Sequence, residues 1–395
     1  MATPTTQPPM PFAGVVCLVV SNLEYGGAQR QVVTLANQFA ACGISSHVIS
    51  LSAYLPLAAG LEGAGSRLHV VQKRFRADVS VVWRLAALLR RLQAKVTHGF
   101  LLDAELAARL ARPLYRRTIV IGSERNTDYQ PRRRHLVPLR LTGRWCDAII
   151  ANSHAGKRFR QRVFGDSADS LFVVPNGVDT GRFSPGEQRA ARARLGLPTQ
   201  AAVVGMVASF KTQKNHPMFF RMARSVLERC PQAVFPCIGG ALHGGLEGSG
   251  AYQAEMRALV AELGIADRVL FPGNQDEVVD WYRACDLTVL TSRREGTPNV
   301  LLESMACGVP VVATDVADNA LIVREGTGFI VPYDDHAAMA GHVARLLGRP
   351  EERRELSRAA RAWVEAEFSL ARLCDRTLAV YQAVRERRRD GAARW

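Results

Sequence analysis

Two glutamates, Glu295 and Glu303, lie eight residues apart near the predicted start of a helix. If both were helical, their backbones would be about 12 Å apart along the helix axis. That separation does not suit two carboxylates that flank one scissile bond in a double displacement. We therefore expect separate roles along one extended ligand. Glu303, inside the helix, is placed to accept both hydroxyls of a ribose, and Glu295, at the tip, to reach a sugar hydroxyl beyond the phosphates.

The residues between the two glutamates predict an anion site. Thr297 is suited to cap the helix, and Pro298 suits its first turn, where a missing N–H costs nothing. The amides that follow project from the carboxyl edge of a predicted strand, and amides at a helix start attract negative charge. The predicted site comprises Gly296, Thr297, Pro298, Asn299, Val300 and Leu301.

These side chains need a parallel sheet to position them. Runs of Val, Ile and Leu recur along the chain and are continuous rather than alternating, which is typical of parallel strands covered on both faces. Helical patterns separate these runs, and such alternation predicts doubly wound α/β sheets. The predicted strands span 15–20, 46–51, 95–97, 118–122, 148–151, 171–174, 202–207, 233–238, 268–271, 287–290 and 310–313. The predicted helices span 29–41, 82–93, 218–229, 252–263, 337–347 and 351–395.

The alternation breaks between Asp179 and Pro198, where Gly and Pro surround a short charged segment. We place a linker at 184–198, between a first domain at 13–183 and a second domain at 199–369. The charged stretch at about 370–395 is predicted to be a helix that packs back on the first domain. Two domains also suit a chain of 395 residues, because single cores rarely grow beyond about 250–300 residues.

The excess positive charge of the chain is confined to its first half. Residues 1–198 contain 27 Lys and Arg against 12 Asp and Glu, whereas residues 199–395 contain 24 of each kind. A one-sided positive field predicts an anionic partner for the first domain, such as membrane headgroups, a diphosphate lipid or nucleic acid. The alternative is a general bias towards arginine, since only five of the 51 basic residues are lysine.

Cysteine usage and the shortness of the apolar runs predict a cytoplasmic protein. The eight cysteines are scattered without a CxxC pair, so neither a disulfide framework nor a zinc site is indicated. The first dozen residues lack the basic and apolar regions of a signal peptide. The longest uninterrupted apolar runs are about six residues long, whereas roughly 20 apolar residues are needed to span a bilayer.

Four stretches of the sequence together resemble the retaining glycosyltransferases of family 4. The segment EGTPNVLLE, from Glu295 to Glu303, resembles the E-x7-E signature of that family. GGAQR from Gly26 resembles its glycine-rich loop, NGVD from Asn176 its turn before the linker, and ASFKTQKN from Ala208 the loop that opens its second domain. The resemblance extends over nearly the whole chain, and the four stretches follow in the family's order.

The resemblance implies a GT-B fold, in which two Rossmann-like, doubly wound domains face each other across a cleft. It also implies that Glu303 binds the donor ribose, Lys214 the diphosphate and Glu295 the donor sugar. Gly26 and Gly27 would let the backbone approach the phosphates or the transferred sugar. Lys214 and the helix-terminal amides would stabilise the leaving nucleoside diphosphate. That group then takes the acceptor proton on the same face, which retains the anomeric configuration.

Two departures from the family pattern bear on the donor site. Many relatives carry Arg where this chain has Ser209, so diphosphate binding is expected to depend on Lys211 and Lys214 together. Many also carry Gly-Gly-x-x-Glu where this chain reads ADNAL from Ala317, which lacks the Glu and resembles a subset with Gly-Asp-Asn-Ala. Asn176 is also assigned to the donor site. No Asp-x-Asp motif occurs, so we expect a UDP- or GDP-sugar co-substrate, no metal and no further cofactor.

Three residues of the first domain are candidates for the acceptor side. His98 ends a predicted buried strand, where ligands gather in Rossmann-like sheets, and it is assigned a catalytic role in orienting the acceptor hydroxyl. Asp103 and Arg125 are assigned to acceptor binding. A structural role is the alternative for each: an isolated histidine is more often structural, and Arg125 equally suits a salt bridge before a basic loop.

Two basic and apolar stretches, Arg132–Arg134 with the residues that follow and the helix predicted at 82–93, could seat the first domain on an anionic membrane. For the helix, the alternative is that it covers its own sheet and exposes a solvated outer face.

The sequence thus predicts a metal-independent, retaining hexosyl- or N-acetylhexosaminyltransferase (EC 2.4) at the cytoplasmic membrane face. Its acceptor would be a glycan or a lipid-diphosphate-linked sugar in cell-surface polysaccharide or glycoconjugate synthesis. Three alternatives stay open: a non-catalytic GT-B protein that binds glycans or partners, a nucleotide-sugar epimerase, and a nucleic-acid-binding protein. The last lacks any recognisable reading motif, so nucleic acid is not the expected partner.

Overall fold

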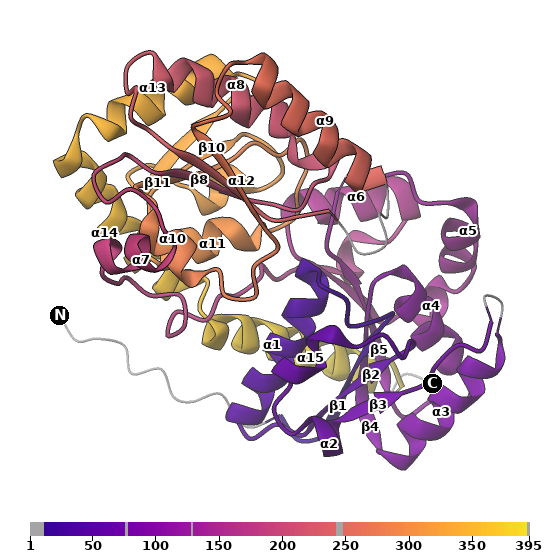
Figure 1. Cartoon of the computed structure of the whole chain (residues 1–395). Coiled ribbons are helices and arrows are strands. Elements are labelled where there is room, and N and C mark those ends of the chain that lie inside the picture. Colours follow the sequence, from indigo (N-terminus) through magenta and orange to yellow (C-terminus); the bar gives the residue numbers. More distant parts are fainter. Residues whose placement is uncertain (1–11, 76–77, 128, 242–247, 393–395) are drawn as a thin grey trace, which may run out of the picture. The chain divides into compact units, whose positions relative to one another are not determined.

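A computed structural model describes residues 12–75, 78–127, 129–241 and 248–392 of the chain. The chain divides into two compact units, each built around one parallel sheet (Figure 1). Unit 1 comprises residues 1–176 together with 370–395, and unit 2 comprises residues 177–369. The chain therefore leaves unit 1 once and returns to it with its last helix.

The sheet of unit 1 has seven parallel strands in the order β3-β2-β1-β4-β5-β6-β7. Strand order reverses between β1 and β4, whose neighbouring residues include Leu18 and His98. Ligands gather at such a reversal because the loops that follow the two strands diverge there. The strands are β1 (Val15–Val20), β2 (Ser46–Ser50), β3 (Leu68–Val70), β4 (Ala94–Phe100), β5 (Ile119–Glu124), β6 (Ala148–Ala151) and β7 (Leu171–Val173).

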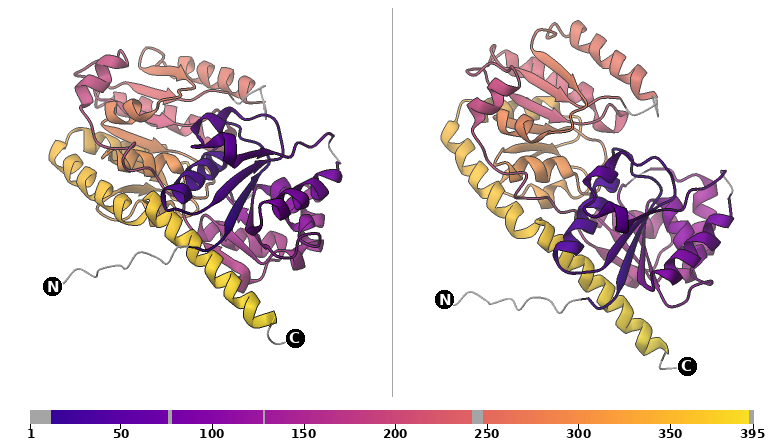
Figure 2. Two further views of the ribbon diagram at one scale, coloured as in Figure 1. Left: turned by 90° about the horizontal axis from the view of Figure 1, so that it is seen from below. Right: turned by 60° about the horizontal axis from the view of Figure 1, so that its bottom comes forward.

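Helices cover both faces of this sheet. Val16, Leu18 and Val20 of β1 point into a core shared with the helix after β1 and with the last helix of the chain. Cys17 and Val19 point into the opposite core. The helices of unit 1 are α1 (Gly27–Ala41), α2 (Ala64–Arg67), α3 (Ser80–Arg91), α4 (Leu102–Ala111), α5 (Arg133–Leu141), α6 (His154–Phe164) and α15 (Leu370–Ala392). Figure 2 shows the yellow helix α15 beside the indigo helix α1, with which it is in contact.

The sheet of unit 2 has six parallel strands in the order β10-β9-β8-β11-β12-β13. Its order reverses between β8 and β11. The strands are β8 (Val204–Val207), β9 (Phe235–Ile238), β10 (Val269–Gly273), β11 (Leu287–Leu290), β12 (Val311–Thr314) and β13 (Gly328–Val331). The helices are α7 (Gln188–Arg194), α8 (His216–Leu227), α9 (Ser249–Glu262), α10 (Val279–Ala284), α11 (Asn299–Ala306), α12 (Asn319–Ile322), α13 (His336–Leu347) and α14 (Pro350–Glu367).

The sequence placed the boundary between the units too late. Val178 donates its backbone N–H to the carbonyl of Phe368, so the chain already belongs to unit 2 soon after β7. The segment predicted as a linker, 184–198, contains α7, which packs on α10. Arg192 of α7 donates to the carbonyl of Ala284 and pairs with Asp286 at 2.8 Å. These contacts make the segment part of unit 2.

Other differences concern short or strongly basic segments. The basic stretch after Arg125, predicted as a loop, forms α5 from Arg133 onwards, although Pro138 lies inside it. Strands β3 and β13 were not predicted: β3 has only three residues, and β13 begins with a glycine, a residue type that is depleted in strands.

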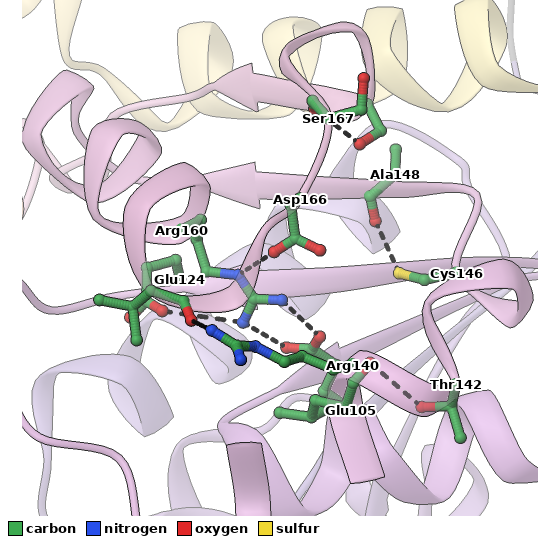
Figure 3. Close-up of polar contacts among 12 residues, drawn as sticks. Glu105, Glu124, Arg140, Thr142, Cys146, Ala148, Arg160, Asp166 and Ser167 are labelled. Carbon is green, nitrogen blue, oxygen red and sulfur yellow. Dashed lines mark hydrogen bonds and ion pairs between the residues drawn. The ribbon is translucent and has the colours of Figure 1, made fainter. Parts of the chain in front are cut away.

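A buried cluster of charged residues joins α4, β5 and α6 below the carboxyl edge of the unit 1 sheet (Figure 3). Glu105 accepts hydrogen bonds from Arg109 at 2.5 Å and from Arg160 at 3.0 Å, and all three side chains are fully buried. Arg160 also pairs with Asp166 at 2.6 Å and lies 3.8 Å from Glu124. Burial raises the pKa of Glu124 to about 7. Removing one partner from such a cluster costs about 3–5 kcal/mol, so it holds the end of β5 firmly in place.

Candidate functional site

The strand reversal of unit 2 brings together the two loops that carry the predicted donor residues. The loop after β8 holds a short 3-10 turn, Thr212–Lys214, and the loop after β11 leads into α11. Because β8 and β11 are neighbouring parallel strands, both loops emerge at the same edge of the sheet.

Hydrogen bonds from backbone and side-chain groups connect these two loops. The amide of Arg293 donates to the carbonyl of Gln213 at 2.8 Å, and the side-chain amide of Gln213 donates to the carbonyl of Arg294 at 2.7 Å. The hydroxyl of Thr291 donates to the carbonyl of Lys214 at 2.8 Å. Residues about 80 positions apart in sequence therefore form one continuous structure around Lys214.

Lys214 and Glu295 form an ion pair beside the start of α11. The Lys214 Nζ lies 2.5 Å from Glu295 Oε1, and the two side chains are 18% and 9% exposed. The predicted diphosphate-binding lysine therefore lies at the predicted helix tip, where its charge is balanced by the carboxylate assigned to the donor sugar. An arriving diphosphate would compete with Glu295 for the ammonium group.

The start of α11 differs in detail from the prediction. Pro298, with φ −74° and ψ 115°, precedes the helix, which begins at Asn299, so Thr297 is not the capping residue. The proline ring fixes φ alone, and the extended ψ keeps this residue outside the helix. The amide of Leu301 donates to the carbonyl of Pro298 at 3.2 Å and is thus already engaged. The first turn of α11 therefore offers fewer amides to an anion than predicted.

Glu303 has a partner that sequence reasoning missed. The hydroxyl of Tyr282, a fully buried residue of α10, donates to Glu303 Oε2 at 2.7 Å. Burial raises the pKa of this tyrosine well above its ordinary value, so the hydroxyl stays protonated and donates. The bond orients the carboxylate of α11. No sequence signal points to it, because the partners are 21 positions apart and a strand and a loop lie between them.

Of the remaining donor candidates of unit 2, Gly296 follows Glu295 and Val300 lies in the first turn of α11, whereas Ser209 and Lys211 lie in the loop after β8. Ser209 and Lys211 are half-buried, and the carbonyl of Ser209 accepts from the amide of Lys211 at 2.8 Å. Gly239 passes so close to this loop that a Cβ there would lie 2.1 Å from the carbonyl oxygen of Ala208. Sequence reasoning also missed the dibasic pair before Glu295, at 293–294, which adds two positive charges to the same loops.

Apart from His98, which lies within β4, the predicted residues of unit 1 follow four strands of its sheet, at the carboxyl edge. Gly26 precedes α1 with an extended backbone, and Gly27 is the first helical residue. Arg125 follows β5 and donates to Asn176 Oδ1 at 3.1 Å, so these two candidates are in direct contact. Burial lowers the pKa of Arg125 to about 10, which still leaves it cationic at neutral pH. Its guanidinium also lies 4.7 Å from the ring centroid of Phe100.

The structure does not support a catalytic role for His98. The side chain is fully buried in β4, and both ring nitrogens are engaged: Nδ1 lies 2.7 Å from the Tyr381 hydroxyl, and Nε2 lies 2.7 Å from Ser123 Oγ. Burial and the charge of Arg125 lower the pKa of His98 well below its ordinary value. His98 therefore connects α15 to the sheet, and neither nitrogen is available to an acceptor hydroxyl.

Asp103, by contrast, is accessible. It lies in the first turn of α4 with its side chain 47% exposed. It pairs with His135 of α5 at 3.2 Å and lies 3.9 Å from Lys73. These contacts connect the segments before and after α4, and they leave the predicted acceptor role untested.

Within the described ranges, no cluster of three or more His, Cys, Asp or Glu residues has the geometry of a metal site. In the same part of the chain, no helix is long and apolar enough to cross a bilayer.

Comparison with known proteins assigns the fold first. The crystal structure of Anabaena Alr3699/HepE in complex with UDP matches with a TM-score of 0.81 at 19% identity, over 93% of this chain and 99% of that one. The sucrose-phosphate synthase of Thermosynechococcus elongatus matches with a TM-score of 0.77 at 21% identity, over 94% of this chain and 99% of that one. The two Rossmann-like units thus define a protein of the GT-B class.

Sequence comparison then gives the family. Residues 25–182 match the family described as Glycosyltransferase Family 4, and residues 187–363 match the family described as Glycosyl transferases group 1. The chain belongs to the GT-B glycosyltransferases of the family 4 type. A D-inositol 3-phosphate glycosyltransferase of Acidothermus cellulolyticus is 36% identical over 252 residues, which are 62% of this chain and 55% of that protein. The chain thus aligns with about half the length of the curated relatives that it matches.

Proposed function

We propose that this protein transfers a sugar from a nucleoside diphosphate sugar to an acceptor with retention of anomeric configuration. The observation that carries the proposal is the pairing of Lys214 with Glu295 at 2.5 Å beside the start of α11. Glu303 lies further along the same helix, with its carboxylate oriented by Tyr282. A lysine paired with one carboxylate, and a second carboxylate further along the same helix, suit a ligand whose diphosphate separates two hydroxyl-bearing sugars.

In the proposed reaction, unit 2 binds the donor and stabilises its leaving group. Glu303 accepts hydrogen bonds from the ribose hydroxyls, and Lys214, with Lys211, binds the diphosphate. The bond between the anomeric carbon and the phosphate oxygen breaks, and Lys214 offsets the charge that develops on that oxygen. The acceptor hydroxyl attacks from the same face and gives its proton to the departing phosphate oxygen. Glu295 would position the transferred sugar.

For the donor, we propose a UDP- or GDP-sugar, used without a metal ion. The solved structure of Anabaena Alr3699/HepE in complex with UDP-glucose supports a uridine nucleotide, although it is only 19% identical.

For the acceptor, we propose a phosphorylated group, such as a lipid-diphosphate-linked sugar in cell-surface glycan synthesis at the cytoplasmic membrane face. Two observations support it: the excess positive charge of residues 1–198, and relatives whose names refer to inositol phosphate. Asp103, which is exposed, and Arg125 would contact this acceptor.

Thermal-shift screening of the full chain against UDP, GDP, ADP and their sugars tests the donor assignment. A ligand present at 100 times its dissociation constant should stabilise its native state by about 2.7 kcal/mol. The screen is repeated with EDTA, which should leave the shift unchanged. No stabilisation by any nucleotide would contradict the proposal.

Product analysis separates transfer from the alternatives. The nucleotide sugar that binds is incubated with and without lipid-diphosphate and glycan acceptors, and the anomeric proton of the product is examined by NMR. Transfer with retention is expected. Turnover without an acceptor would indicate an epimerase, and binding without turnover a non-catalytic protein. Duplex DNA binding with a steep salt dependence would favour the nucleic-acid alternative.

A further inference from the structure

We propose that the outer face of unit 1 formed by α3 and α5 binds an anionic phospholipid bilayer. We call it the α3–α5 face and define it by Val79, Trp83, Arg133, Arg134, Val137 and Leu141. This inference rests on the proposed function and extends it, because a lipid-linked acceptor is presented at a bilayer.

Helix α3 exposes apolar side chains that its own core does not need. Val81, Leu85, Leu88 and Leu89 already cover the sheet and are buried. Val79 is nevertheless 76% exposed and Trp83 is 64% exposed. These two residues are four positions apart and so lie on one side of the helix, opposite the core. Exposed apolar side chains mark an interaction surface when they form a patch, so Val79 and Trp83 matter together with the apolar side chains of α5.

Helix α5 repeats this pattern with more charge. Leu141 is 75% exposed, and Val137, four positions earlier, is 50% exposed. Arg133, Arg134 and Arg140 are exposed on the same short helix. The sequence contains five arginines and no carboxylate from 131 to 145. From 79 to 102, which includes α3, it contains four basic residues and again no carboxylate.

Two observations place the helices on one side of unit 1. Helix α4 contacts both α3 and α5, so the three helices form a continuous layer (Figure 1). The carboxylate of Asp103 on α4 lies 3.2 Å from His135 of α5 and 3.9 Å from Lys73, which precedes α3. The Asp103 side chain thus contacts both the segment that precedes α3 and helix α5.

The combination of side chains favours a bilayer over other partners. Arginines bind lipid phosphates, while valine, leucine and tryptophan side chains enter the headgroup and upper acyl region. Nucleic acid would use the arginines, but its phosphate backbone offers nothing to the aliphatic side chains. A protein partner would have to supply carboxylates and an apolar patch at the same spacing, whereas an anionic bilayer supplies both without a fixed pattern.

Flotation with lipid vesicles tests the proposal on the full chain without donor or acceptor. Vesicles of phosphatidylcholine alone are compared with equimolar phosphatidylcholine and phosphatidylglycerol. We expect association with the anionic vesicles only, weakened by 0.5 M NaCl, and quenching of tryptophan fluorescence by brominated lipid. Equal binding to both vesicles, or to neither, would overturn the proposal without touching the donor site, which the nucleotide screen reports separately.

Variants locate the surface. Val79→Ser with Trp83→Ser should weaken vesicle binding at least tenfold, whereas Trp83→Phe should retain most of it. Arg133→Ser with Arg134→Ser should weaken it by about fivefold for each arginine removed. Leu321→Ser, an exposed leucine of unit 2, and Arg221→Ser with Arg224→Ser, exposed on α8, are the matched controls and should bind normally. With folding verified by circular dichroism, wild-type binding by the α3 and α5 variants would refute the assignment.

Discussion

The ion pair between Lys214 and Glu295 gives the sharpest test of the donor site. Two substitutions each remove one charge of the pair. Lys214→Met removes the cation with little change in side-chain length, and Glu295→Gln removes the anion but keeps an acceptor oxygen. Both destabilise the ligand-free protein, because each leaves one charge without its partner. Of the two substitutions, only Lys214→Met should weaken nucleoside diphosphate binding, because Lys214 and not Glu295 is proposed to contact the phosphates.

The magnitudes follow from the geometry of the pair. At 2.5 Å and an effective dielectric constant of about 20, the direct attraction is about 7 kcal/mol, most of which desolvation offsets. Breaking a fully buried pair costs about 3–5 kcal/mol. Since these side chains are 18% and 9% exposed, we expect about 2 kcal/mol for either substitution. For a unit of this size, that lowers the melting temperature by about 4–8 °C.

The effect on binding should separate the two variants. A charge-assisted hydrogen bond contributes about 1.5–3 kcal/mol, so Lys214→Met should raise the dissociation constant of UDP or GDP by about 10- to 150-fold. At a concentration 100 times the wild-type constant, a 30-fold loss reduces ligand stabilisation from about 2.7 to about 0.9 kcal/mol. Glu295→Gln should bind the nucleotide as tightly as the wild type or more tightly, because it no longer competes with the diphosphate.

Isothermal titration calorimetry measures the affinities, and scanning calorimetry measures the ligand-free melting temperatures. Glu295→Gln should also lose transfer activity, because its assigned role is towards the donor sugar. Equal loss of nucleotide affinity in both variants would refute this division of roles. Normal affinity in Lys214→Met would refute the diphosphate assignment itself.

Three further predictions concern the buried groups around the two sites. Glu303→Ala should abolish nucleotide-induced stabilisation, and Tyr282→Phe, which removes one hydrogen-bond donor to the carboxylate, should weaken nucleotide affinity about five- to tenfold in calorimetry. Tyr381→Phe should lower the free energy of unfolding by about 1–3 kcal/mol in urea, since it removes one of the two partners of His98, while the rate of transfer to the acceptor stays unchanged. A lower transfer rate at unchanged stability would return His98 to the active site. Because the folded pKa of Glu124 is raised to about 7 from 4.5, the native state holds a proton that the unfolded state releases. The free energy of unfolding should therefore fall as pH rises from 4.5 to 7, by up to about 3 kcal/mol relative to that of Glu124→Gln. The same pH dependence of this free energy in both proteins would contradict the prediction.

Local patterns in the sequence were enough for much of the architecture. The strands at 15–20, 148–151 and 287–290 were predicted to the residue, because continuous apolar runs bounded by polar residues are typical of buried parallel strands. The same reasoning placed the predicted donor residues in loops after parallel strands. The boundary between the two units was predicted less accurately. The change from unit 1 to unit 2 depends on the hydrogen bond between Val178 and Phe368, which no local pattern reveals.

The sequence by itself determined two doubly wound sheets and the concentration of positive charge in the first half, and it supplied the residue types of the proposed anion site around Glu295 and Glu303. Each of these depends on residues that are close in sequence or on composition alone. Only the tertiary structure decided that Lys214 pairs with Glu295, that Tyr282 orients Glu303, and that His98 is engaged by Tyr381. Such contacts join residues 81, 21 and 283 positions apart, and strand order and side-chain packing determine which of them meet.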